Sequence, residues 1–282
     1  MSVDHYENFP VASLLCPPAL RPAIAAIYHY ARTADDIADE GSASPAERLS
    51  DLAAYRTELR WVAQGGGPAP RWAGVFAPLA AAIASHGLPL NLLEDLLSAF
   101  EQDVVKTRYA DRADLLDYCS RSANPVGRLL LHLYGIDEPQ AGLQSDAVCT
   151  ALQLINFWQD PSVDLPRGRL YIPLDQCAAH GVGEDDLFSQ ADTPATRALL
   201  QSQCEWARSL MLRGAPLVHR VPGRAGWELR GVVQGGLRLL DRIAALQYAT
   251  LRRRPRLGPL DVPRIAWRAL WMRPPPQRRA WE

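Results

Sequence analysis

The chain has few of the features that define several common classes of protein. Its five cysteines form no CxxC pair, and its six histidines form no HExxH motif. A disulfide framework and a zinc site are therefore not expected, and the cysteines fit reduced, mostly buried thiols. No uninterrupted run of about 18 apolar residues is present, so we expect no transmembrane helix.

Lysine is almost absent as well, because Lys106 is the only one. The chain has 30 basic and 31 acidic residues in total, so its formal net charge is −1. A chain this close to neutral lacks the positive charge typical of nucleic-acid-binding proteins, so no nucleic-acid partner is expected. Residues 1–10 contain Asp4 and Glu7 and no apolar core, so we expect no signal peptide and a cytoplasmic location.

Strand patterns are nearly absent, whereas apolar residues recur at helical spacing along most of the chain. In residues 22–38, for example, Ile24, Ile27 and Ala31 lie three and four residues apart. The same periodicity predicts helices over residues 46–63, 90–107, 114–134, 146–160, 193–213 and 225–253. Residues 44–47 (Ser-Pro-Ala-Glu) form a helix-capping signature. No repeat or linker divides the chain, so the sequence predicts one all-α domain, a helical bundle over residues 1–282.

The tail has a different composition. Residues 252–282 contain nine arginines and two acidic residues, with Trp267, Trp271 and Trp281 among them. Two interpretations stay open. In the first, the tail makes peripheral contact with the inner face of the cytoplasmic membrane, through Ile265, Leu270 and Trp271 together with its arginines. In the second, Trp267 and Trp271 pack on the bundle and the arginines are solvated.

Asp35 and Asp39 lie four residues apart in a helical segment, so their carboxylates emerge on one face. Like charges at this spacing repel and favour a bound cation. Mg²⁺ suits such a site, because it is shared readily between one or two carboxylates and substrate phosphates. Arg32 precedes Asp35 by about one turn, where its guanidinium can contact a phosphate. A solvated acidic helix end is the alternative interpretation.

A second polar stripe runs along an otherwise apolar segment, where Gln153, Asn156, Asp160 and Asp164 recur three or four residues apart. Apolar neighbours indicate that this stripe faces an interior cavity, in which unpaired carboxylates would be costly. Two aspartate-rich helices facing each other would hold Mg²⁺ ions and bind a diphosphate. A capping cluster at a helix end is the alternative. Pro161 lacks a backbone N–H, so we expect it to kink the helix and shift Asp164 relative to Asp160.

Arg167, Arg169 and Tyr171 follow in a loop, where the arginines can neutralise a leaving diphosphate. Together with the two aspartate motifs, this pattern resembles the squalene/phytoene synthase family over most of the chain. Residues 5–10, 31–40, 122–127 and 156–160 are most similar to its hydroxysqualene synthase branch. The resemblance implies an isoprenoid-synthase-like helical bundle with a central cavity, in which Mg²⁺ is the cofactor.

The resemblance also implies roles for individual residues. The catalytic positions correspond to Asp35, Asp39, Asp160, Asp164 and Arg32. The metal-binding positions are the same four aspartates with Asn156. The substrate-binding positions correspond to His5, Asn8, Phe9, Tyr28, Tyr118, Ala123, Gly127, Gln153, Asn156, Arg169 and Tyr171. Aromatic rings that can stabilise a carbocation are Phe9, Tyr28, Tyr118, Phe157 and Trp158, and core packing is the alternative for each.

The chain departs from the family pattern in places. Asn8 stands where a serine is usual, residues 123–127 read Ala-Asn-Pro-Val-Gly instead of Ala-Gly-Thr-Val-Gly, and Gly235-Gly236 stands about where a tyrosine is common. These changes bear on a full two-step condensation more than on ionisation of the substrate.

The implied reaction converts presqualene diphosphate and water to hydroxysqualene and diphosphate, a carbon–oxygen lyase reaction. Functional coupling to a presqualene diphosphate synthase is part of this expectation. The alternative enzyme is a head-to-head prenyltransferase that condenses farnesyl diphosphate to squalene, presqualene diphosphate or phytoene. A non-catalytic scaffold of the same fold is a further alternative, and the four retained aspartates argue against it.

Overall fold

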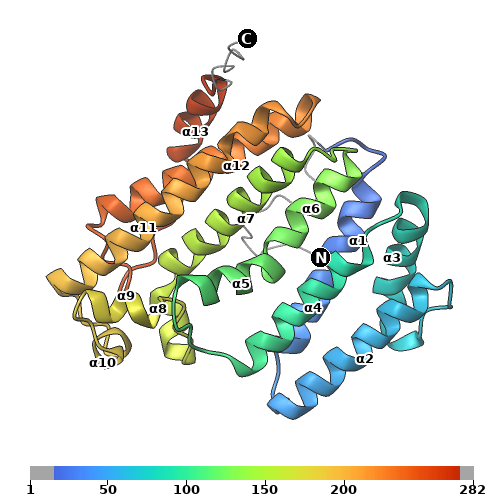
Figure 1. Ribbon diagram of the computed structural model, residues 1–282, viewed down its shortest axis with the longest axis horizontal. Helices are drawn as coiled ribbons and strands as arrows, with labels where there is room; N and C mark the ends of the chain where they lie inside the picture. Colours follow the sequence, from blue (N-terminus) through green and yellow to red (C-terminus); the bar gives the residue numbers. More distant parts are fainter. Residues whose placement is uncertain (1–15, 274–282) are drawn as a thin grey trace, which may run out of the picture.

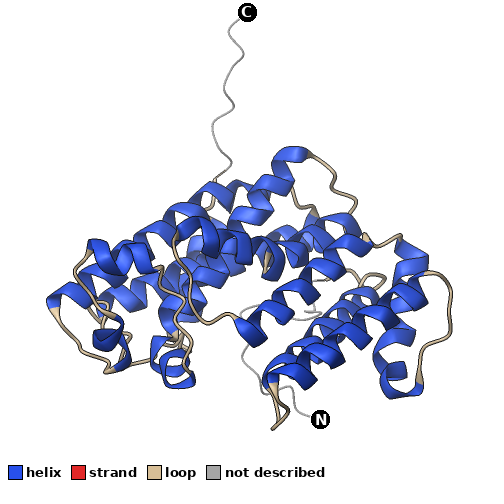
Figure 2. Cartoon of the chain, turned by 60° about the horizontal axis from the view of Figure 1, so that its bottom comes forward, coloured by secondary structure: helices blue, strands red, loops and turns tan. Residues whose placement is uncertain are grey.

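The computed structural model describes residues 16–273, which form a bundle of helices (Figure 1). No strand forms among these residues (Figure 2), and an isolated bridge pairs Arg108 with Leu170. The longer helices are α1 (Arg21–Asp39), α2 (Pro45–Ala63), α3 (Ala73–His86), α4 (Leu90–Val105), α5 (Arg112–Ser122), α6 (Asn124–Leu133), α7 (Pro139–Gln159), α11 (Pro194–Gly214), α12 (Gly223–Ala245) and α13 (Asp261–Leu270). The all-α prediction is confirmed.

Short helical segments connect the longer helices. They are the α-helices α8 (Pro161–Asp164), α9 (Leu174–Ala179) and α10 (Glu184–Phe188), and the 3₁₀ helices η1 (Pro70–Trp72), η2 (Leu165–Arg167) and η3 (Ala215–His219). No helix of the described part of the chain is both long and apolar enough to cross a membrane.

Several helix boundaries follow the local sequence. The predicted capping box forms at the start of α2, where the Ser44 backbone N–H donates to Glu47 Oε2 at 2.8 Å. The segment expected as one helix over residues 114–134 is instead two helices, α5 and α6, which meet at Ala123. Pro125 explains this break, because it lacks the backbone N–H that a continuous helix needs and is tolerated in the first turn of a new helix, where α6 places it.

Two other boundaries differ from the predictions. The helix expected to reach residue 253 ends at Ala245, because Gln247 and Tyr248 adopt left-handed conformations with φ of 52° and 61°. Helix α3 was not predicted at all, because its run of alanines gives little periodic contrast. Helix α7 also begins earlier than expected, at Pro139.

The buried apolar residues form two main clusters, and the space between them becomes the site. One cluster joins α1–α4 with α6 and contains the stacked rings of Tyr30 and Tyr55. The other joins α5, α7, α11 and α12 and contains Trp158. Figure 1 shows α6 of the first group and α7 of the second side by side in the middle of the bundle. All five cysteines are buried and free, as expected.

Candidate active site

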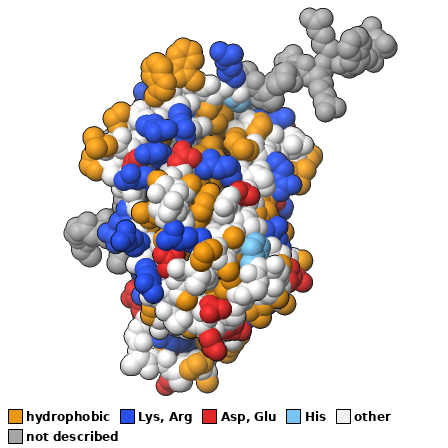
Figure 3. All heavy atoms as spheres, turned by 90° about the vertical axis from the view of Figure 1, so that its left-hand side faces the viewer, with side chains coloured by type: hydrophobic (Ala, Val, Ile, Leu, Met, Phe, Trp, Pro, Cys, Tyr) orange, Lys and Arg blue, Asp and Glu red, His pale blue; other side chains and the backbone are white. Residues whose placement is uncertain are grey.

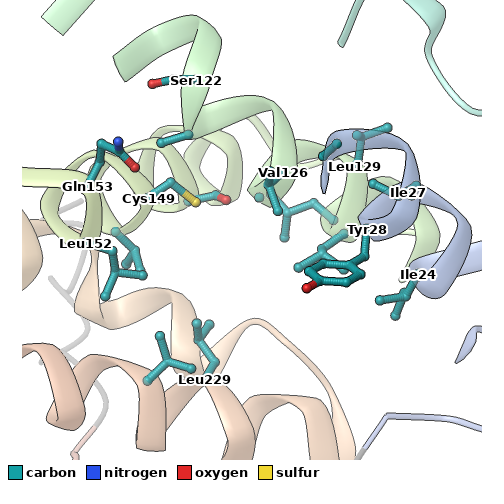
Figure 4. A pocket seen from close by; sticks show the side chains of 18 of the residues that line it. Ile24, Ile27, Tyr28, Ser122, Val126, Leu129, Cys149, Leu152, Gln153 and Leu229 are labelled. Carbon is teal, nitrogen blue, oxygen red and sulfur yellow. The ribbon is translucent and has the colours of Figure 1, made fainter. Parts of the chain in front are cut away.

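A cavity of about 520 Å³ lies between the two apolar clusters. Its walls come from α1, α6, α7, η3 and α12, whose side chains converge on the same space (Figure 4). Most of the lining is aliphatic and includes Ile24, Ile27, Val126, Leu129, Val148, Leu152 and Leu229. A cavity with such walls fits a flexible hydrocarbon chain, and the expectation of a central cavity is met.

One end of this cavity is strongly polar, and we call it the mouth. Arg32, Asp35, Gln153, Asn156, Asp160 and Arg254 line the cavity there. An adjoining polar pocket of about 510 Å³ is lined by Arg32, Asp35, Asp39, Glu40, Arg167 and Arg169. The polar stripes of α1 and α7 therefore meet at one place, although they are far apart in the sequence. Helices α1 and α7 both end at this mouth, and so does α4, which contributes Phe100 to the cavity wall.

The carboxylates of α1 are held by arginines. Arg32 Nη1 lies 3.1 Å from Asp35 Oδ2. Arg169 Nη2 lies 2.5 Å from Asp39 Oδ1, and Arg167 Nη1 lies 3.5 Å from Asp39 Oδ2. Arg169 reaches α1 because its loop is fixed to the segment after α4, where the Leu170 backbone N–H donates to the Thr107 carbonyl at 3.0 Å. The mouth therefore holds acidic and basic groups in contact. The basic groups can bind an anion, and the acidic groups can bind cations that accompany it.

The second aspartate motif is bent, as Pro161 predicts. Helix α7 ends at Gln159, and Asp160 leaves the helix with φ −108° and ψ 18° before α8 begins at Pro161. The Asp160 carboxylate accepts two hydrogen bonds from the guanidinium of Arg254, at 2.6 and 2.8 Å. No sequence pattern indicates this pair. Burial and, to a smaller extent, the nearby Asp160 carboxylate raise the pKa of Asp164 to about 7, although neighbouring arginines act in the opposite direction.

Asp103, which was not predicted as a site residue, also belongs to this region. It lies near the end of α4, and Tyr118 Oη donates to its Oδ2 at 2.9 Å. Burial raises the pKa of Asp103 to about 7, with smaller contributions in the same direction from Asp35 and Asp39. Tyr118 and Arg169 act in the opposite direction. A single acidic residue within a helix gives no sequence signal that it faces carboxylates of another helix.

The raised pKa of Asp103 gives a prediction for the protein without ligands. The unfolded chain has a carboxyl pKa near 3.9, so between about pH 4 and 7 the folded state binds more protons. Stability therefore falls as the pH rises through this window. We expect Asp103→Asn to unfold at the same urea concentration as the wild type near pH 3.5, where the carboxyl group is protonated in the folded state and largely protonated in the unfolded state. At pH 8 the variant should be more stable by roughly 4 kcal/mol, because the difference between a pKa of about 7 and one near 3.9 is then fully expressed. Equal stabilities at pH 8 would contradict a strained carboxylate.

The structure divides the predicted aromatic residues between cavity and core. Tyr28 lines the cavity. Tyr118, Phe157 and Tyr171 instead pack against one another beside the mouth, and the rings of Phe157 and Tyr171 stack with centroids 3.8 Å apart. Trp158 is fully buried in the core. Tyr118 and Phe157 belong to the core cluster of α5, α7, α11 and α12 and are not among the residues that line the cavity, so the core interpretation describes their position better.

The remaining predicted residues fall into two groups. Ala123, Gly127, Gln153 and Asn156 line the cavity, whereas His5, Asn8 and Phe9 lie outside the described residues. At Gly127, a Cβ atom would lie 2.3 Å from Ser145 Oγ and 2.5 Å from Cys149 Sγ. Glycine therefore allows α6 to approach α7 closely at the cavity wall.

Gly236 stands about where a tyrosine is common in the family, and this difference also has a structural consequence. A Cβ atom at Gly236 would lie 2.8 Å from Met211 Cε and 3.3 Å from both Ile155 Cδ1 and Leu152 Cδ2. These side chains fill the space in which a larger residue would lie. A tyrosine at this position would require them to move, and Leu152 is part of the cavity wall.

The residues of the mouth fit Mg²⁺ when it is shared with a substrate. Within residues 16–273, no three carboxylate, histidine or cysteine side chains lie close enough to hold a metal ion by themselves. Mg²⁺ takes oxygen ligands and is commonly held by one or two carboxylates together with phosphate oxygens. Asp35 and Asp160 line one cavity from opposite helices, and the half-buried Asp164 lies beside Asp160. This donor set suits metal ions that bind together with a diphosphate.

The fold and the site agree with one family of enzymes. The model of the squalene/phytoene synthase family matches residues 3–261. The chain belongs to this family, whose members act on prenyl diphosphates.

Particular relatives make the similarity more specific. The chain is 34% identical to a hydroxysqualene synthase of Sinorhizobium fredii, with 91% of this chain and 85% of that one covered. It is 36% identical to a hydroxysqualene synthase of Rhodopseudomonas palustris, with 90% and 85% covered. Among solved structures, a squalene synthase from Alicyclobacillus acidocaldarius superimposes with a TM-score of 0.80 at 36% identity, covering 86% of this chain and 90% of that one.

Proposed function

We propose that this protein is a hydroxysqualene synthase, which ionises presqualene diphosphate and captures the rearranged carbocation with water. The observation that carries the proposal is the joining of an apolar cavity to a mouth of carboxylates and arginines. The relatives named hydroxysqualene synthase support this choice within the family.

The chain's own residues account for binding and ionisation. Arg32, Arg169 and Arg254 lie around the mouth, where their positive charge can offset the charge of the diphosphate. As the C–O bond breaks, both of its electrons leave with the diphosphate, and this charge stabilisation lowers the barrier. Mg²⁺ bound with the diphosphate at Asp35, Asp39, Asn156, Asp160 and Asp164 would supply further positive charge to the leaving group.

The cavity has the opposite task of protecting the carbocation. Its aliphatic walls offer no nucleophile over most of their area, and the ring of Tyr28 presents aromatic surface to the same space (Figure 4). The final bond forms between a water oxygen and the cationic carbon, and the water then loses a proton. A strong general base is not required, because a carbocation reacts readily with neutral water.

A head-to-head prenyl synthase is the second candidate, because other members of the family support it. The chain is 31% identical to a phytoene synthase of Thermus thermophilus, with 90% of this chain and 84% of that one covered. The solved structure that is 36% identical is described as a squalene synthase. The two candidates differ in substrate, which makes them easy to separate.

The deciding experiment incubates the purified protein with presqualene diphosphate or with farnesyl diphosphate, each with and without Mg²⁺. We expect a C30 alcohol from presqualene diphosphate only, and only with Mg²⁺. In H₂¹⁸O the alcohol should carry one solvent oxygen. The Asp160→Asn variant is the control for contaminating activity. Efficient condensation of farnesyl diphosphate by this protein alone would instead assign it to the head-to-head synthases.

A further inference from the structure

Helix α13 is attached to the rest of the protein through its polar side. Asp261, at its start, is 2% exposed and accepts a hydrogen bond from Arg238 Nε at 2.6 Å. Arg268 Nη1 donates to Asp241 Oδ2 of α12 at 2.9 Å. At the other end of the helix, Arg230 Nη1 donates to two backbone carbonyl oxygens, each at 3.2 Å. Charged groups therefore hold this helix in place, together with the buried Ala269 and with Met272, which packs against the core.

The apolar side of α13 faces solvent. Leu260 is 92% exposed, Trp267 63% and Trp271 60%, and Leu270 is similarly exposed. Spacings of three, four and seven residues put these side chains on one face of the helix. The rings of Trp267 and Trp271 lie 5.6 Å apart and contact each other. The interpretation in which these tryptophans pack on the bundle is therefore wrong.

This arrangement is the reverse of an ordinary surface helix, which buries its apolar face and solvates its polar one. Single exposed apolar residues are common on proteins, but a contiguous group marks a surface that binds something. Trp227 of α12 extends the group, since it is exposed and lies beside Arg230, whose guanidinium carbon is 4.5 Å from its ring centroid. We call Trp227, Leu260, Trp267, Leu270 and Trp271 the exposed apolar patch.

The charge around this patch is positive. Residues 208–273 contain 14 arginines and three acidic residues, although the whole chain is nearly neutral. Asp241 and Asp261, two of those acidic residues, are each paired with two arginines. Arg264 and Arg273 are exposed and form no ion pair with a described residue. Figure 3 shows arginine side chains gathered in the upper part of one face, with hydrophobic side chains protruding above them.

We propose that α13 docks on the surface of an anionic lipid membrane, without crossing it. Trp267, Leu270 and Trp271 would enter the interface, and Arg264 and Arg273 would contact the headgroups. The positive charge favours an anionic partner, and the exposed apolar face favours a partner with a hydrocarbon interior. An anionic lipid membrane has both properties. The match to the family model ends at residue 261, where α13 begins, so the family match covers Trp227 and Leu260 but not the rest of α13. The inference does not depend on the reaction catalysed.

Vesicle flotation of the full-length protein tests the proposal. Phosphatidylcholine vesicles are compared with vesicles that also contain phosphatidylglycerol, at low and high salt. We expect flotation with the anionic vesicles at low salt and loss of binding at high salt. Trp267→Ser/Trp271→Ser should reduce the bound fraction about tenfold. The matched control Val105→Ser/Leu143→Ser replaces two similarly exposed apolar residues of α4 and α7 and should leave binding unchanged. Arg264→Gln/Arg273→Gln should weaken binding and reduce its salt dependence.

Three results would overturn the proposal. The first is failure of the wild-type protein to float with anionic vesicles at low salt. The second is equal binding by the wild type and the double tryptophan variant, with circular dichroism confirming that both are folded. The third is a wild-type protein that does not float but forms a dimer, when the double tryptophan variant is a monomer. In that case a second copy of the chain, and not a membrane, would cover the exposed apolar patch. If the tryptophan variant does not fold, Leu270→Asp provides the same comparison.

Discussion

Replacing Asp35 or Asp160 with asparagine is expected to abolish most turnover while leaving the fold intact. Each substitution removes one negative charge that faces the diphosphate site from α1 or α7. Under the proposed function these carboxylates would hold the cations that neutralise the leaving diphosphate, so each loss should lower kcat by about 10²- to 10³-fold. Steady-state rates at saturating Mg²⁺ give the effect. The wild-type melting temperature should rise when Mg²⁺ and diphosphate are added together, and this rise should shrink in the variants.

Asp36→Asn is the matched control for Asp35→Asn. Asp36 lies on the same helix beside Asp35 and is also paired with Arg32, but it is not part of the cavity lining. We expect a loss of less than about tenfold from this change, because surface ion pairs contribute little. Similar losses from both substitutions would indicate that helix charge alone matters. A fully active Asp160→Asn enzyme, or turnover without divalent metal, would contradict the proposed role of the aspartates.

The second large effect is expected from Arg169→Met. Arg169 is 21% exposed and contacts Asp39, and its charge also lowers the pKa of Asp103 and Asp164. Its removal takes the shorter of the two ion pairs from Asp39 and a positive charge from the surroundings of Asp103 and Asp164. Under the proposed function, it also removes a positive charge that offsets the charge of the diphosphate. We expect kcat/KM to fall by about 10²- to 10³-fold.

Arg167→Met is the control for this prediction, because it removes the same charge from the neighbouring position. Arg167 is 60% exposed and lies 3.5 Å from Asp39, so solvent screens its charge. A decrease of less than about tenfold is expected. If both variants lost activity equally, the cause would be the overall charge of the mouth and not the position of Arg169. Melting temperatures of both variants show whether either change disturbs the loop.

The parts of the site that lie on single helices could be predicted from the sequence. Helical geometry relates Asp35 to Asp39, and the polar stripe that contains Asn156 stands out against apolar neighbours. The break at Pro161 was equally visible, because the missing N–H acts locally. The resemblance then supplied the expectation that these two helices face each other across a cavity.

Contacts between distant elements could not be predicted in this way. Arg254 lies 94 residues from Asp160, and Asp103 meets Tyr118 and the carboxylates of α1 only after α4 and α5 are packed. The division of the aromatic residues also depended on tertiary packing. Tyr28 and Tyr118 have the same chemistry, but one lines the cavity and the other bonds to a buried carboxylate.

The ends of α1, α4 and α7 at the mouth have a consequence for the order of binding. Each helix presents its C-terminal carbonyl groups there, and such an end carries a dipole charge equivalent to about −0.5. A bare diphosphate approaching the mouth would therefore meet three repulsive helix ends and the carboxylates, which oppose the attraction of the four arginines there. A diphosphate that arrives with metal ions presents positive charge to the same groups. Under the proposed function, the backbone would thus favour joint entry of cation and substrate, and it would favour escape of the product diphosphate once its cations leave.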